Sequence, residues 1–227
     1  MHSRFLSFMS LNLQLSNWLL AFSLIVTALV ALPASAKLIS PSTQTILVFG
    51  DSLSASYGVP QGQGWVALLE TKLAQKQSSK TTYKVVNASI SGETTSGGLA
   101  RFGEMLTSHK PNIVILELGA NDGLRGLPIP EMQANLSQMI AQAKTVKAKV
   151  LLIGMKIPPN YGLKYSKNFS VTYTNLAKQH NIALVPFLLE SVAGKPELIQ
   201  TDGLHPIVAA QPALLNNVWA QLRGLLR

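Results

Sequence analysis

The chain has 227 residues and a formal charge of +9, because it contains 19 Lys and Arg residues but only 10 Asp and Glu residues. Its length suggests one domain or at most two small ones, and its hydrophobic fraction of 47% is ample for a packed core. Because Cys is absent and Asp occurs only at Asp51, Asp122 and Asp202, we exclude disulfide scaffolds, thiolate metal sites and a cysteine nucleophile, and expect no metal and no other cofactor.

Residues 1–36 differ in composition from the rest of the chain, and Arg4 is their only charged side chain. An apolar run over 18–32 ends at Pro33 and is followed by Ala34-Ser35-Ala36. This order predicts a secretory signal peptide cleaved near Ala36, leaving a single domain over 37–227 in a bacterial periplasm. The alternative is a retained membrane anchor, for which the run is short, since about 20 apolar residues span a bilayer.

The positive charge is scattered along the chain, and its one tight group is Lys144, Lys147 and Lys149. Such a group is typical of a solvated helix end, and a second interpretation is weak contact with an anionic membrane surface. Neither a zinc finger nor a basic stripe interleaved with aromatic residues is present, so we expect no nucleic-acid partner. We expect a monomer.

Apolar runs that resemble β-strands alternate with helical patterns of hydrophobicity. The strand-like runs are 45–49, 84–87, 113–118, 150–155 and 182–187. The expected helices are 65–75, 97–109, 130–145, 165–180 and 211–226. Most runs are apolar on both faces, which suits a parallel sheet covered on two sides. The sequence therefore predicts an α/β fold with one doubly wound domain.

In such a sheet, ligands bind beyond the carboxyl ends of the strands, so polar residues that follow a strand are candidates for a site. Ser52 follows the first run, where a serine acts as a nucleophile or only caps a helix. Gly92 follows the second run and offers an unhindered backbone N–H, or belongs to an ordinary loop. Asn121 follows the third run, where its amide donates into the site or simply forms a turn.

Two further carboxyl groups need an interpretation. Glu117 is unusual inside an apolar run, and we interpret it as a buried, hydrogen-bonded structural carboxylate. Asp202 precedes His205 by three residues, so it can accept a hydrogen bond from one imidazole nitrogen while the other faces the site, or it can cap a helix. His109 and His180 close expected helices and are interpreted as surface residues.

Considered together, these residues supply a nucleophile, oxyanion donors, a base and a carboxylate that orients the base. The G-x-S-x-G elbow of ordinary α/β-hydrolases is missing from the sequence. Walker A, G-x-G-x-x-G and H-E-x-x-H motifs are missing too, which argues against nucleotide, dinucleotide and zinc-hydrolase chemistry.

The motifs Gly50-Asp51-Ser52-Leu53, Gly92, Gly119-Ala120-Asn121-Asp122 and Asp202-Gly203-Leu204-His205-Pro206 resemble the blocks of the SGNH, or GDSL, hydrolase superfamily. The chain looks closest to its periplasmic thioesterase I/protease I/lysophospholipase L1-like branch, whose members are also called arylesterases. Two positions depart from that branch, since Glu93 stands where Asp is common and Lys156 where Arg is common.

The resemblance implies a flavodoxin-like three-layer α/β/α fold with a five-stranded parallel sheet, and hydrolysis of esters, thioesters and lysophospholipids without a metal. It implies that Ser52, Asp202 and His205 form the catalytic triad, and that Ser52, Gly92 and Asn121 form the oxyanion hole. It also implies a substrate-binding groove formed by Gly123, Leu124, Arg125, Gly126, Leu127, Pro128, Met155, Ile157, Pro158 and Tyr161.

Two other functions remain open at this point. A carbohydrate O-acetylesterase on the same fold would carry polar and aromatic residues for sugar stacking, whereas the expected groove is rich in Leu, Ile and Pro. A non-catalytic envelope-binding module would keep the fold, but the complete set of catalytic side chains argues against it.

Overall fold

The computed structural model describes residues 42–226 except Ser79. The predicted signal peptide, its cleavage near Ala36 and the predicted start of the mature chain at Lys37 lie outside the described residues. Within this part of the chain, no helix combines the length and the apolar character that crossing a membrane requires.

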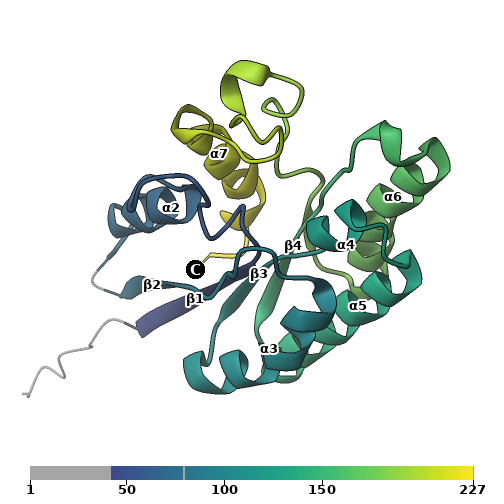
Figure 1. Ribbon diagram of the computed structural model, residues 1–227. Coiled ribbons are helices and arrows are strands. Elements are labelled where there is room, and N and C mark those ends of the chain that lie inside the picture. The colour runs from purple at the N-terminus through teal and green to yellow at the C-terminus, as the bar shows by residue number, and fades with distance from the viewer. Residues whose placement is uncertain (1–41, 79, 227) are drawn as a thin grey trace, which may run out of the picture. The chain divides into compact units, whose positions relative to one another are not determined.

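A five-stranded parallel sheet with the order β2-β1-β3-β4-β5 forms the centre of the fold (Figure 1). Its strands are β1 (Ser42–Gly50), β2 (Thr81–Asn87), β3 (Ile113–Glu117), β4 (Lys149–Ile153) and β5 (Ala183–Val185). All five begin or end within a few residues of the predicted runs. The predicted parallel sheet is therefore confirmed.

Helices cover both faces of the sheet (Figure 1). On one face, α2 (Trp65–Ala74) packs against α7 (Gln211–Leu222). On the other face, α5 (Ile129–Thr145) packs between α3 (Thr95–His109) and α6 (Leu163–His180). This confirms the predicted α/β/α layers. The short α4 (Ala120–Leu124) was not predicted. The described part of the chain also contains the 3₁₀ turns η2 (Pro159–Tyr161), η3 (Pro196–Leu198) and η4 (Val208–Ala210).

The core lies between the sheet and its two helical layers. Residues 46–49 of β1 and 114–116 of β3 are fully buried, as expected for central strands that are covered on both faces. Met132 and Met139 of α5 are buried as well and pack in this core. Because the helices run back antiparallel to the strands, the loops that follow the strands gather at one edge of the sheet.

Candidate active site

Ser52 lies on the turn that follows β1 and lines a pocket at the carboxyl edge of the sheet. The backbone N–H of Ala55 donates to the backbone oxygen of Asp51 over 2.9 Å, and the backbone N–H of Tyr57 donates to the backbone oxygen of Ser52 over 3.0 Å. The next helix, α2, begins only at Trp65. Ser52 therefore does not cap that helix, and the alternative that it serves only as a helix cap is wrong.

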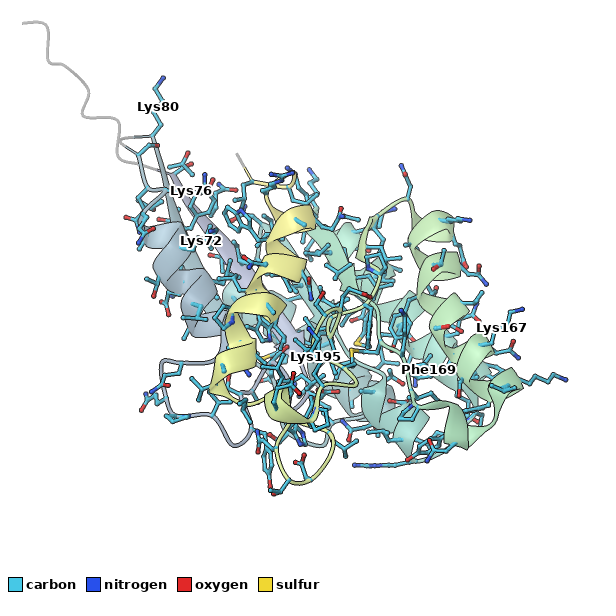
Figure 2. The ribbon with its side chains drawn as sticks, turned by 90° about the horizontal axis from the view of Figure 1, so that it is seen from above. Lys72, Lys76, Lys80, Lys167, Phe169 and Lys195 are labelled. Carbon is cyan, nitrogen blue, oxygen red and sulfur yellow. The ribbon has the colours of Figure 1, made fainter. Side chains whose placement is uncertain are left out.

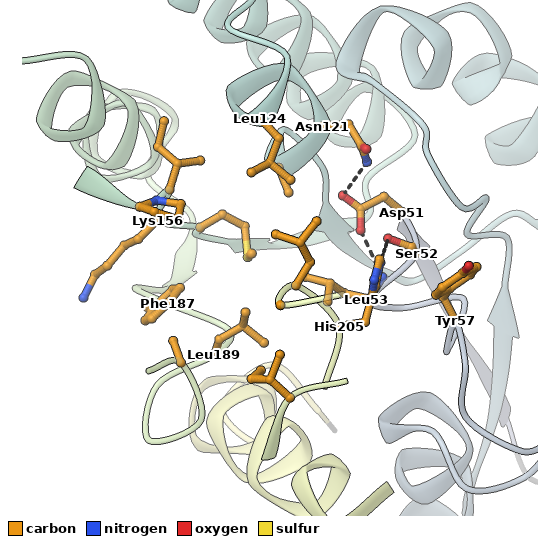
Figure 3. Close-up of a pocket in the computed structure, with 18 of the residues that line it drawn as sticks. Asp51, Ser52, Leu53, Tyr57, Asn121, Leu124, Lys156, Phe187, Leu189 and His205 are labelled. Atoms are coloured by element: carbon orange, nitrogen blue, oxygen red, sulfur yellow. Dashed lines mark hydrogen bonds between the residues drawn. The ribbon is translucent and has the colours of Figure 1, made fainter. Parts of the chain in front are cut away.

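A continuous chain of hydrogen bonds joins Ser52, His205 and Asp202. His205 Nε2 lies 2.8 Å from Ser52 Oγ (Figure 3). On the other side of the ring, His205 Nδ1 lies 2.6 Å from Asp202 Oδ2. A carboxylate at this position requires the proton on Nδ1, which leaves Nε2 free to accept the hydrogen bond from the Ser52 hydroxyl.

Asp202 remains charged because several donors converge on it. Burial acts to raise the pKa of Asp202, but the backbone N–H groups of His205 and Leu204, at 3.0 and 2.9 Å, and the His205 ring outweigh it. Together they lower the pKa of Asp202 from 3.8 to about 2. Its carboxylate is therefore available throughout the neutral range to stabilise an imidazolium.

Two glutamines that sequence reasoning missed connect the His205 loop and α7 to the rest of the site. Gln200 Nε2 donates to the backbone oxygen of Tyr57 over 2.9 Å, across 143 residues of sequence. The buried Gln211 accepts from the backbone N–H of Trp65 over 3.0 Å, across 146 residues. No local pattern marks these residues, because their partners become neighbours only in the folded chain.

Asn121 and Gly92 line the same pocket as Ser52. Asn121 Nδ2 donates to the backbone oxygen of Glu93 over 3.1 Å and lies 3.3 Å from Asp51 Oδ2. Gly92 has a φ of +79°, in the region that favours glycine. Ser52, Gly92 and Asn121 thus border one space, in which an oxyanion would meet N–H donors.

Two buried carboxyl groups lie behind the Ser52 turn. Glu117 Oε2 accepts from Ser54 Oγ over 2.6 Å and from the backbone N–H of Asp51 over 3.3 Å. Burial raises the pKa of Asp51 to about 6. Burial and the neighbouring Asp51 raise the pKa of Glu117 well above its ordinary value. The prediction that Glu117 is a buried, hydrogen-bonded carboxylate is confirmed.

The pocket beside Ser52 has a volume of about 630 Å³ and a mainly apolar lining (Figure 3). Near its outer end, the side chain of Lys156 is 54% exposed, with Nζ 3.7 Å from Glu190 Oε2 and 4.6 Å from the centre of the Phe187 ring. Such a space suits an apolar substrate group that reaches the Ser52 hydroxyl. The apolar lining residues include Leu124, Met155, Ile157, Pro158, Phe187, Leu189, Ile199 and Leu204.

The structure divides the ten residues of the expected groove into two sets. Leu124, Met155, Ile157 and Pro158 line the pocket. The other six are not part of its lining: Gly123, Arg125, Gly126, Leu127, Pro128 and Tyr161. The chain after β5 contributes Phe187, Leu189 and Ile199, which sequence reasoning missed because no motif precedes them there.

Local packing explains why residues of the second set lie outside. A Cβ atom on Gly123 would lie 2.6 Å from Phe169 and 2.8 Å from Ile157, so this glycine lets α4 pack closely. Arg125 Nη2 donates to the backbone oxygen of Gly92 over 2.8 Å. Leu127 and Tyr161 are 37% and 40% exposed.

This arrangement contains a candidate for each part that defines a serine hydrolase: a nucleophile, a base, an orienting carboxylate and oxyanion donors beside an apolar pocket. Among the described residues, no group of three or more His, Asp or Glu side chains could hold a metal ion.

Comparison with known proteins agrees with this class. The model of the GDSL-like lipase/acylhydrolase family matches residues 48–211. Esterase TesA of Pseudomonas aeruginosa is 51% identical over 185 residues, which cover 82% of this chain and 90% of that protein. Thioesterase 1/protease 1/lysophospholipase L1 of Escherichia coli is 42% identical over 185 residues, covering 82% and 86%.

Solved structures give the same result. The crystal structure of TesA is 52% identical, has a TM-score of 0.77 and covers 81% of this chain and 100% of that chain. The monoethylphosphonate-inhibited esterase EstA of Pseudoalteromonas sp. is 41% identical, with a TM-score of 0.75 and coverage of 80% and 97%. The chain therefore belongs to the GDSL-like lipase/acylhydrolase family. It is an ester hydrolase.

Proposed function

We propose that the protein cleaves carboxylic esters and thioesters through an acyl-enzyme on Ser52. The observation that carries this proposal is the hydrogen-bond chain from Ser52 through His205 to Asp202 beside an apolar pocket. The names of similar proteins support the substrate range, since they include an esterase, an arylesterase of Vibrio mimicus and a thioesterase/lysophospholipase.

In the acylation step, Ser52 Oγ attacks the carbonyl carbon while His205 Nε2 takes the hydroxyl proton and Asp202 stabilises the imidazolium. The carbonyl electron pair moves onto oxygen, where the N–H groups of Ser52 and Gly92 and the amide of Asn121 donate. To do so, Asn121 redirects one N–H that it now gives to Asp51 or Glu93. Collapse breaks the bond to the leaving oxygen or sulfur, which takes the proton from His205.

In the deacylation step, a water molecule attacks the acyl carbon of the Ser52 ester while His205 takes its proton. The second tetrahedral intermediate collapses to the carboxylic acid, and the proton returns to Ser52 Oγ. Each half of the reaction uses the same base and the same oxyanion donors, so one site serves both.

The apolar lining favours substrates with acyl chains, including lysophospholipids, over the acetylated sugars that a carbohydrate O-acetylesterase would cleave. Leu124, Ile157, Leu189 and Ile199 offer no hydrogen bonds to a sugar. An acetyl-xylooligosaccharide esterase shares the fold at 22% identity, a level that supports the fold alone.

The test is labelling with a fluorophosphonate probe, which forms a covalent bond to an activated serine. Ser52→Ala should abolish labelling and lower kcat/KM on p-nitrophenyl butyrate by several orders of magnitude, with folding intact. Ser91→Ala is a matched control in the same pocket and should keep the label. A Ser52→Ala protein that keeps more than about a tenth of the wild-type rate would contradict the proposal.

We also propose that the protein is exported to the periplasm as a monomer that starts at Lys37. The support is the basic start, the apolar run and Ala34-Ser35-Ala36 in the sequence. Intact-mass measurement of protein recovered from the periplasm tests the cleavage, and light scattering during gel filtration tests the monomer. Retention of residues 1–36 or a dimer mass would contradict the respective part.

A further inference from the structure

The exposed apolar side chains of the described part of the chain are distributed unevenly. Nine large apolar residues are exposed there, and Val146 and Val171 are the two that lie away from the loops following the strands. The other seven, here called the rim residues, lie on those loops or begin the helix that follows. After β1, β2 and β3 come Tyr57, Ile90 and Leu127. After β4 come Tyr161 and Leu163, and after β5 come Leu204 and Val208.

A ring contact and a hydrogen bond connect several of these loops. The Tyr57 ring lies 4.7 Å from the His205 ring, which places it beside the loop that holds Leu204. Tyr165 Oη of α6 donates to the backbone oxygen of Leu127 over 2.8 Å, so the start of α6 and the loop after α4 lie together. Tyr57 and Leu204 also line the pocket itself. At Tyr57 and Leu204, the exposed apolar surface is therefore continuous with the lining of the pocket.

Leu163 is the most exposed rim residue, with 79% of its surface accessible, although it begins a helix whose other apolar residues are mostly packed. An apolar side chain in that position adds nothing to the core. Clustered exposed apolar side chains of this kind mark surfaces that contact lipid or protein.

Charged side chains on the same loops favour lipid as the occupant. Exposed cations there are Arg125, Lys156, Lys164, Lys167 and Lys195, against the exposed carboxylates of Glu131, Glu190, Glu197 and Asp202. Of these carboxylates, Asp202 is paired with His205. Figure 2 shows Lys167 and Lys195 far from Lys80, which lies beyond α2 at the opposite end of the molecule. Long basic side chains around an apolar surface suit a bilayer interface, where they reach phosphate groups while the apolar residues enter the headgroup region.

We propose that the rim residues dock the protein onto the surface of a phospholipid bilayer that contains anionic lipid, with the mouth of the pocket facing the membrane. In this orientation, an amphiphile passes from the bilayer into the pocket without crossing water. The proposal concerns binding and is separate from the proposed hydrolysis, because docking is measured in a protein that cannot hydrolyse.

The experiment measures co-sedimentation of the full chain carrying Ser52→Ala with vesicles of phosphatidylcholine and about one third phosphatidylglycerol. Added substitutions Ile90→Ser, Leu163→Ser and Val208→Ser should together lower the vesicle partition coefficient roughly tenfold. The matched control is Val146→Ser/Val171→Ser, which removes apolar side chains of similar exposure from other surfaces and should leave the partition coefficient within about twofold. Every protein has the same residues 1–41, so differences between them report the substituted positions.

Salt distinguishes the proposed surface from a purely electrostatic one. Docking through apolar rim residues should persist at about 0.5 M NaCl, whereas binding through Lys72, Lys76 and Lys80 at the opposite end (Figure 2) is screened there. Binding that is lost in salt and unaffected by the three rim substitutions overturns the proposal, as does the absence of vesicle binding. A dimer that dissociates on Leu163→Ser would assign the surface to a second copy of the chain and also overturn it. With Ser52 intact, the triple variant should hydrolyse soluble p-nitrophenyl acetate at the wild-type rate, which shows that it folds.

Discussion

The amide of Asn121 lies 3.3 Å from the carboxylate of Asp51, a residue that precedes it by 70 positions. The second contact of this amide, with the backbone oxygen of Glu93 at 3.1 Å, holds it from the other side. The carboxylate of Asp51, next to Ser52, therefore orients the side chain that we propose as an oxyanion donor.

Asp51→Asn should lower kcat while changing KM little. The new amide has one oxygen, and that oxygen is already required by the backbone N–H of Leu53, so an N–H group would face the Asn121 amide. Complete loss of one oxyanion donor lowers kcat by about 10²- to 10³-fold. Because Asn121 would be misplaced rather than lost, we expect kcat to fall by about tenfold. Steady-state kinetics on p-nitrophenyl butyrate measure both constants. An unchanged kcat would show that Asn121 does not depend on Asp51.

The buried carboxyl pair should make the protein less stable as pH rises. Because the pKa of Asp51 is raised from 3.8 to about 6 and burial raises that of Glu117 well above its ordinary value, the folded protein binds more protons than the unfolded chain in this range. The free energy of unfolding should therefore fall as pH rises from about 4 through 6 and continue to fall as Glu117 ionises. Asp202 acts in the opposite sense, since its pKa is lowered to about 2, and its contribution is lost only as pH falls from about 4 toward 2.

Urea unfolding between about pH 4 and 8 measures this dependence. Glu117→Gln provides the comparison, because its amide oxygen can still accept from Ser54 and Asp51 while its NH₂ replaces Oε1, which has no hydrogen-bond partner in the described part of the chain. The variant should flatten the upper part of the profile. A wild-type profile that is already flat from pH 5 to 8 would contradict the expected ionisation of Asp51.

Asp202→Asn should lower kcat by about 10²- to 10⁴-fold while Ser52 remains in place. An amide at this position can donate to His205 Nδ1 and so favour the wrong tautomer, and it cannot stabilise an imidazolium. Stopped-flow assays with p-nitrophenyl acetate measure the loss, and a thermal melt checks the fold. A variant with wild-type activity would show that another group orients His205.

The preference for acyl-chain length should depend on pocket-lining residues that follow β4 and β5. Burying one methylene is worth about 0.8 kcal/mol, so each added carbon should raise kcat/KM by up to roughly fourfold until the pocket is full. Ile157→Ser and Leu189→Ser should therefore reduce hydrolysis of octanoyl esters far more than hydrolysis of acetyl esters. A series of p-nitrophenyl esters tests this, with Val146→Ser as the control on another surface. Equal losses at every chain length would place the acyl chain elsewhere.

The sequence predicts most of the fold because the strands are nearly continuous apolar runs separated by amphipathic helices. Residues 46–49 are buried on both faces, and such runs are recognisable without any tertiary information. Ser52, Asn121 and His205 are predictable as candidates because each follows a strand or lies in the last loop. The order of the strands in the sheet determines which of these residues become neighbours.

Other features leave no local signal. The helix α4 has five residues, too few for a hydrophobic period, and its Asn121-Asp122-Gly123 is typical of a turn. Asp122 becomes a buried acceptor for the Thr95 hydroxyl, at 2.6 Å, only when α3 packs beside it. Phe187 and Leu189 follow the short β5, where no motif indicates a pocket.

The strand order has a consequence for the timing of activity. The proposed nucleophile Ser52 follows β1 and its proposed base His205 follows β5, with β3 and β4 between these strands in the sheet. The two residues are 153 positions apart in the sequence. During synthesis, Ser52 is therefore present long before the imidazole of its proposed base. An unfinished chain therefore contains the serine without its proposed base. We expect catalytic competence to arise only after the last loop has been synthesised and has folded against the sheet.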